Sequence, residues 1–145
     1  MDTVIISAII SASISAIISS IVSYRIANKK NIKDEEGRLN EHILVLNKIS
    51  IEYPYLEDYD FCKAWRKNSN DERYLRYEVY CCIAFNLLEQ LYKLYKGDKI
   101  KIENFICVKE LVQMHKLWWK NPTGIFENIS GYNQKFREYI ETFLK

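Results

Sequence analysis

Two groups of aromatic and basic side chains are the residues of this chain best suited to hold a ligand. One is the segment Lys116–Lys120, which reads KLWWK. The other consists of Trp65, Arg66 and Lys67 together with Arg73 and Arg76, which follow across a short polar loop. Aromatic faces beside Lys and Arg hold bases and phosphates in nucleic-acid-binding proteins. We therefore predict a ligand site drawn from these groups, with core packing as the alternative role of the aromatics. The predicted ligand-binding residues are Arg66, Lys67, Arg73, Arg76, Lys116, Trp119 and Lys120.

We make a separate prediction about the side chains of Trp118 and Trp119. Adjacent residues on a helix point about 100° apart, so we expect that both rings cannot face the core. At least one of them is predicted to lie at a rim, at a domain contact or at a ligand.

No arrangement typical of an enzyme or a metal site is found in the sequence. His42 and His115 have no catalytic neighbours, and His115 is predicted to be a hydrogen-bonded core residue. Phosphate-binding glycine loops, GxSxG and HExxH are absent. Four cysteines form no CxxC pair and are expected to be reduced. We predict no catalytic residues, no metal, no cofactor and a protein that is not an enzyme.

The most regular pattern in the chain is a serine every four residues from Ser7 to Ser23, within the uncharged segment 3–24. A helix over these residues is roughly 33 Å long, close to the hydrocarbon core of a bilayer at about 30 Å. The pattern predicts a transmembrane helix, assigned to residues 1–27. It is expected to be an uncleaved anchor, because no basic segment precedes it and no signal-peptidase motif follows.

Small side chains in a membrane helix let neighbouring backbones approach, so the stripe predicts self-association. The sequence leaves two alternatives open. The helix is either a self-associating anchor or one wall of a pore formed by several copies. In the pore, serine hydroxyls wet the lumen and isoleucines close it. The predicted pore-lining residues are Ser7, Ser11, Ser15 and Ser19, and the predicted gate is Ile10, Ile14, Ile17 and Ile21.

Basic residues follow this segment at once, at Arg25, Lys29, Lys30 and Lys33, whereas only Asp2 and the amino terminus precede it. By the positive-inside rule the N-terminus lies outside and the rest of the chain is cytoplasmic. We expect a single-pass protein of the cell inner membrane. Beyond Lys30 the chain has 18 basic and 18 acidic residues, so any basic site there must be local.

The remaining sequence predicts helices and no convincing strand. Helices are expected over 34–52, 71–96 and 103–120 and from Gly131 onward, with short helical turns over 55–65 and an extended link at 99–105. Apolar residues of the second helix recur at spacings of 3 and 4, which makes it the centre of the domain. We predict an all-α protein with a juxtamembrane linker helix over 28–53 and a cytosolic sensor domain of four to five helices over 54–145.

The layout resembles small bacterial membrane proteins with one N-terminal span and a cytosolic helical domain. The resemblance rests on EYPYLEDYDFCKAW, RYEVYCCIAFNLLEQLY, HKLWWKNP and GYNQKFREYIETFL, which cover nearly half of the predicted soluble part. Such proteins are similar to membrane effectors of nucleotide-signalling anti-phage systems. The resemblance implies a homo-oligomer, a tetramer by preference, whose cytosolic domain binds a nucleotide or short oligonucleotide made by a nucleotidyltransferase encoded nearby.

The predicted function is therefore an oligomeric membrane effector that forms a ligand-controlled ion-conducting pore. The alternative is a membrane-tethered module that binds a protein partner, with a span that only mediates self-association.

Overall fold

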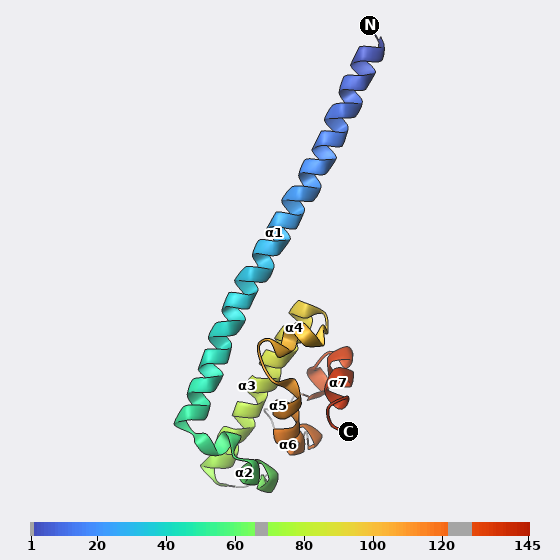
Figure 1. The fold of residues 1–145 in the computed structure, drawn as a ribbon. Helices are drawn as coiled ribbons and strands as arrows, with labels where there is room; N and C mark the ends of the chain where they lie inside the picture. Colours follow the sequence, from blue (N-terminus) through green and yellow to red (C-terminus); the bar gives the residue numbers. More distant parts are fainter. Residues whose placement is uncertain (1, 66–69, 122–128) are drawn as a thin grey trace. The chain divides into compact units, whose positions relative to one another are not determined.

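The computed structural model describes residues 2–65, 70–121 and 129–145, with side chains from Ile18 onward. The described residues form seven α-helices and two 3-10 helices and contain no strand, which confirms the all-α prediction. In chain order these elements are α1 (Asp2–Glu52), η1 (Pro54–Glu57), α2 (Tyr59–Ala64), α3 (Glu72–Tyr95), α4 (Lys99–Glu103), α5 (Val108–Met114), α6 (Lys116–Lys120), η2 (Ile129–Gly131) and α7 (Gln134–Glu141) (Figure 1).

The chain divides into two compact units, residues 1–37 and residues 38–145. The first unit is helical, and its side chains from Ile18 to Ile26 are all exposed. In the described part of the chain, no helix combines the length and the apolar character needed to cross a membrane.

The second unit is built around α3, as the sequence predicted. The side chains of Tyr77, Cys81, Ala84, Leu88 and Leu91 are completely buried along this helix. Against it pack apolar residues from the other elements of the unit, and burial of each such side chain contributes about 1.5–3 kcal/mol. These include Leu39 and Leu46 of α1, Ile102 of α4, Val108 and Val112 of α5, and Phe136 and Ile140 of α7.

Short polar side chains fix where the helices of this unit begin. Asp58, Asp71, Asp98 and Asn133 each accept a hydrogen bond from a backbone N–H in the first turn of the helix that follows. Such caps satisfy donors that have no partner inside the helix. At the other end, Glu52 is the last residue of α1 because Pro54 follows, and Lys96 and Gly97 with positive φ angles end α3.

Two sequence predictions about helices are wrong. The segment predicted as an extended link contains α4, because the Asp98 cap starts a new helix and Ile102 anchors it in the core. The single helix predicted over 103–120 is two helices, α5 and α6, separated at His115 with φ −104° and ψ 20°. No proline or glycine occurs at this bend, and the His115 side chain there is completely buried.

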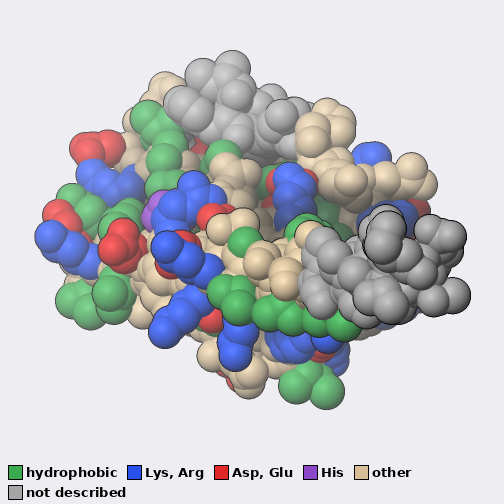
Figure 2. Space-filling model, turned by 90° about the horizontal axis from the view of Figure 1, so that it is seen from above, with side chains coloured by type: hydrophobic (Ala, Val, Ile, Leu, Met, Phe, Trp, Pro, Cys, Tyr) green, Lys and Arg blue, Asp and Glu red, His purple; other side chains and the backbone are tan. Residues whose placement is uncertain are grey.

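All four cysteines are free thiols, with Cys62 and Cys81 buried and Cys107 exposed. Acidic and basic side chains are interspersed over the face that Figure 2 presents, in keeping with the balanced charge of the sequence beyond Lys30.

Candidate functional site

The pocket of about 700 Å³ formed by α6, η2 and α7 is the candidate ligand site of this chain. It contains two residues that the sequence selected, Trp119 and Lys120, which lie at the end of α6. Its volume falls in the range of small-molecule sites, about 300–1,000 Å³. The other lining residues come from η2 and α7: Ile129, Gln134, Arg137, Glu138 and Glu141.

Both tryptophans of α6 are buried, and Trp119 also lines the pocket. Trp118 is completely buried and stacks on Phe85 at a centroid distance of 5.3 Å. Trp119 is only 3% exposed and packs between Phe85, at 4.8 Å, and Tyr132, at 5.6 Å. The prediction that both rings cannot face the core is therefore wrong, because α3 covers one side of α6 and the segment from Tyr132 to α7 covers another. Trp119 also lines the pocket, so its role at a ligand stays a prediction.

Trp119 presents its edge to the pocket, whereas neighbouring rings cover its faces. Its Nε1–H donates a hydrogen bond to Oε1 of Glu141 at 3.2 Å. Phe136 closes on the ring edge-on at 6.2 Å. Because the indole is 3% exposed, it has no open face on which a base could stack. Recognition in this pocket therefore depends on charge and hydrogen bonds.

Arg137 is the functional side chain that sequence reasoning missed. It lies beside Phe136, at the edge of the apolar face of α7, and its Nε is buried without a hydrogen-bond partner among the described residues. A buried guanidinium nitrogen left unpaired is costly. The residue also lines the pocket, so its guanidinium could form a charge-assisted bond with an anion that entered. The sequence signal was present, since the predicted inward positions Phe136 and Ile140 place residue 137 at the border of the core.

Acidic residues balance the two cations of the pocket. Glu141 accepts from Trp119, and Glu138 accepts from the side-chain amide of Gln134 at 2.9 Å. With Lys120 and Arg137, the formal charge of the described lining residues is zero. The arrangement suits a ligand that has one anionic group and several hydrogen-bond donors.

The second predicted group of basic residues is engaged within the protein. Arg73 pairs with Asp71 through Nε and Nη2, and the latter bond is 2.6 Å long. Arg76 donates to the hydroxyl of Tyr55 at 2.6 Å, pairs with Glu72, and lies 4.2 Å from the centre of the Tyr53 ring. These contacts hold the start of α3 to the segment after α1. Arg66 and Lys67 lie outside the described residues.

His115 lies in a buried cluster of polar side chains. Its Nδ1 is 2.9 Å from the hydroxyl of Tyr77 and 3.8 Å from the sulfur of Cys62, and the residue is completely buried. Burial lowers its pKa to about 4, so the ring is neutral at pH 7. The prediction of a hydrogen-bonded core histidine is confirmed.

The structure brings only part of the predicted ligand residues together. Trp119 and Lys120 line one pocket, whereas Lys116 is exposed on the same helix and lines none of its walls. Of the predicted pore residues, Ser19 and Ile21 are exposed. The side chains of the others lie outside the described residues: Ser7, Ser11, Ser15, Ile10, Ile14 and Ile17.

No protein-family model, no curated protein and no solved structure matches this chain. The similarity to membrane effectors of anti-phage systems is therefore a prediction from sequence pattern.

Proposed function

We propose that this chain is an oligomeric single-span membrane effector whose helical domain binds a small nucleotide and thereby controls conduction through the assembled spans. The observation that carries the ligand part is the α6–α7 pocket, which the basic residues Lys120 and Arg137 both line. The membrane part rests on the uncharged segment 3–24 with its serine repeat.

In this proposal a phosphate group of the ligand binds Lys120 and Arg137. Ribose hydroxyls or base amino groups donate to the carboxylates of Glu138 and Glu141. Because these acids offset the two cations, the pocket favours a ligand with one or two phosphate charges over a triphosphate. Control of the pore requires that the ligand bind one state of the assembly better than the other; a difference of about 1.4 kcal/mol shifts the equilibrium tenfold.

The ligand part is tested with full-length protein in mild detergent, titrated with AMP, ATP and the dinucleotide ApA. We expect AMP or ApA to bind more tightly than ATP. The changes Lys120→Gln and Arg137→Gln should each weaken binding about tenfold, since each removes a charge-assisted hydrogen bond. Lys116→Gln is the matched control on the same helix and should bind as the unaltered protein does. Equal affinity in all three variants would contradict the assignment of the pocket.

The pore part is tested by recording current across planar bilayers that contain the full-length protein. Ser11→Leu combined with Ser15→Leu removes hydroxyls from the predicted lumen and adds apolar bulk to the helix contact. We expect current to be lost while nucleotide binding in the helical domain persists. Current that survives the double change would contradict a serine-lined pore.

A second function, a membrane-tethered module that docks a protein partner, is favoured by one feature of α3. Leu75, Val79 and Ile83 recur every four residues and are 36–50% exposed, so they form an apolar stripe on the surface of the second unit. Changing Val79 to Asp should abolish partner binding under this alternative and leave bilayer currents unchanged.

A further inference from the structure

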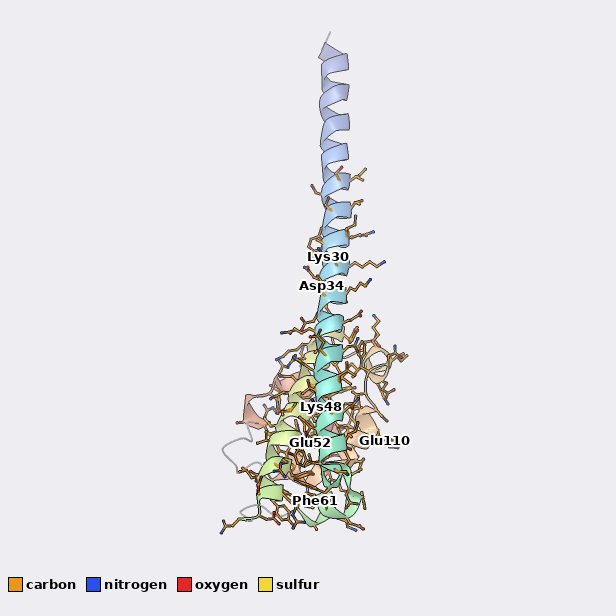
Figure 3. All side chains as sticks on the ribbon, turned by 90° about the vertical axis from the view of Figure 1, so that its left-hand side faces the viewer. Lys30, Asp34, Lys48, Glu52, Phe61 and Glu110 are labelled. Atoms are coloured by element: carbon orange, nitrogen blue, oxygen red, sulfur yellow. The ribbon has the colours of Figure 1, made fainter. Side chains whose placement is uncertain are left out.

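A second pocket, of about 360 Å³, lies where the last turns of α1, η1, α3 and α5 meet within the second unit. Its chemistry differs from that of the α6–α7 pocket. Carboxylates approach it from two elements, Glu57 from η1 and Glu110 from α5, while Leu46, Leu111 and Met114 form an apolar wall. Figure 3 labels Glu110 beside the lower part of α1, where Lys48 and Glu52 are also labelled.

The hydroxyl groups in this pocket are hydrogen-bonded within the protein. The Tyr80 hydroxyl donates to Oε1 of Glu57, and it also lies 2.8 Å from Oγ of Ser50. The Ser50 hydroxyl donates to the carbonyl of Leu46 at 3.1 Å. The carboxylates of Glu57 and Glu110 are acceptors only, whereas the side chain of Asn47 offers both amide N–H donors and a carbonyl acceptor. Acceptor atoms therefore outnumber donor groups among the described residues that line the pocket.

The charges of the lining residues also favour a cation over an anion. The described residues that line this pocket include two carboxylates and no Lys, Arg or His side chain. An anion would meet repulsion there, whereas a cation would be attracted by both acids. In the described part of the chain, no group of three or more His, Cys, Asp or Glu side chains is placed to hold a metal ion. The apolar wall instead suits the carbon body of an organic ligand.

We propose that this pocket binds a small organic cation, with an amidinium, guanidinium or ammonium group between Glu57 and Glu110 and an apolar body against Met114 and Leu111. A planar group with several N–H donors meets the acceptors of the pocket in the way that Arg meets carboxylates. The site joins α1 to α5, so its occupant would strengthen the packing of the last turns of α1 on the helical domain. This assignment does not depend on the proposed nucleotide site.

The test uses benzamidine and its neutral isostere benzamide on the full-length protein in mild detergent. The readout is the rate at which iodoacetamide alkylates Cys107, an exposed thiol that lines the pocket, followed by mass spectrometry. We expect benzamidine to slow this reaction and benzamide to have no effect. Alkylation of Cys82, which lies outside the pocket, is the internal control and should not change.

Two variants assign the effect to the carboxylates. Glu110→Gln should reduce the affinity for benzamidine about tenfold, the loss expected for one charge-assisted hydrogen bond. Glu41→Gln, an exposed carboxylate on α1 that does not line the pocket, should leave the affinity unchanged. Equal protection by benzamide, unchanged affinity in the Glu110 variant, or no protection by benzamidine, agmatine or spermidine at millimolar concentration would each overturn the proposal.

Discussion

His115 illustrates how a single buried residue makes the stability of this fold depend on pH. The ring is completely buried between Tyr77 and Tyr80, with Nδ1 on the Tyr77 hydroxyl and Nε2 unpartnered among the described residues. A proton on this ring would place a charge among aromatic side chains and the thiol of Cys62. Burial therefore holds the pKa at about 4, below the ordinary value of 6.5.

The consequence is a loss of stability on acidification. Between pH 6.5 and pH 4 the unfolded chain binds a proton at His115 that the folded chain does not, so the free energy of unfolding falls as the pH falls. The slope is about 1.4 kcal/mol per pH unit, which amounts to about 2 kcal/mol at pH 5. Urea denaturation of the full-length protein at pH 7.5 and pH 5 measures this difference.

Carboxylates can also gain protons between pH 7.5 and pH 5. The contribution of His115 is therefore isolated by comparing variants. His115→Gln should lower the free energy of unfolding at pH 7.5 and should also remove the part of its pH dependence that comes from His115. His42 is an exposed residue of α1, so His42→Gln should leave that part of the pH dependence in place. A pH dependence that is identical in all three proteins would show that His115 does not titrate as its burial requires.

At the scale of helices, two glycines should have opposite effects on stability. Gly97 has φ +79° at the end of α3, and a Cβ there would lie 2.9 Å from Cε2 of Tyr92. Gly37 lies within α1, and a Cβ there would meet no described atom within 4 Å apart from its chain neighbours and the adjacent helix backbone. We expect Gly97→Ala to destabilise the protein by about 1 kcal/mol or more and Gly37→Ala to stabilise α1 by about 0.5–1 kcal/mol. Thermal unfolding followed by circular dichroism measures the stability of both variants. If Gly37→Ala also destabilised the protein, the placement of Gly37 within helix α1 with space for a Cβ would be contradicted.

The sequence predicted the elements whose signals are local. Capping residues predict both ends of α3, with Asp71 before its start and Gly97 after its end. Proline predicts the end of α1, which lies just before Pro54. The break at His115 did not follow, because no proline or glycine marks it; the contact of the His115 ring there is with Tyr77, which lies 38 residues earlier. The α6–α7 pocket was predicted only in part. Lys120 was visible as a basic residue beside aromatics, but Arg137 became part of the site only when α7 packed on α6.

At the scale of the whole molecule, the two candidate pockets and the segment 3–24 can be assigned to separate tasks. Both pockets lie within the second unit, residues 38–145. Among their described lining residues the charges differ: acids and bases balance in one pocket, whereas the charged residues of the other are acidic. The serine repeat lies entirely in the first unit. Variants in either pocket should therefore alter ligand binding without altering self-association of the spans, and variants in the repeat should do the reverse.

The proposed orientation in the membrane gives a prediction of its own. Four basic residues, Arg25, Lys29, Lys30 and Lys33, follow the uncharged segment 3–24, and moving such charges across a bilayer is unfavourable. With Asp2 changed to Cys, a membrane-impermeant maleimide should label position 2 in spheroplasts, whereas native Cys107 should react only after the membrane is permeabilised. Changing all four basic residues to Gln should make the labelling of both positions mixed, because the bias in orientation is then lost. Labelling of Cys107 from outside in the protein that retains its basic residues would contradict the proposed topology, and release of the protein from membranes by salt alone would contradict the span itself.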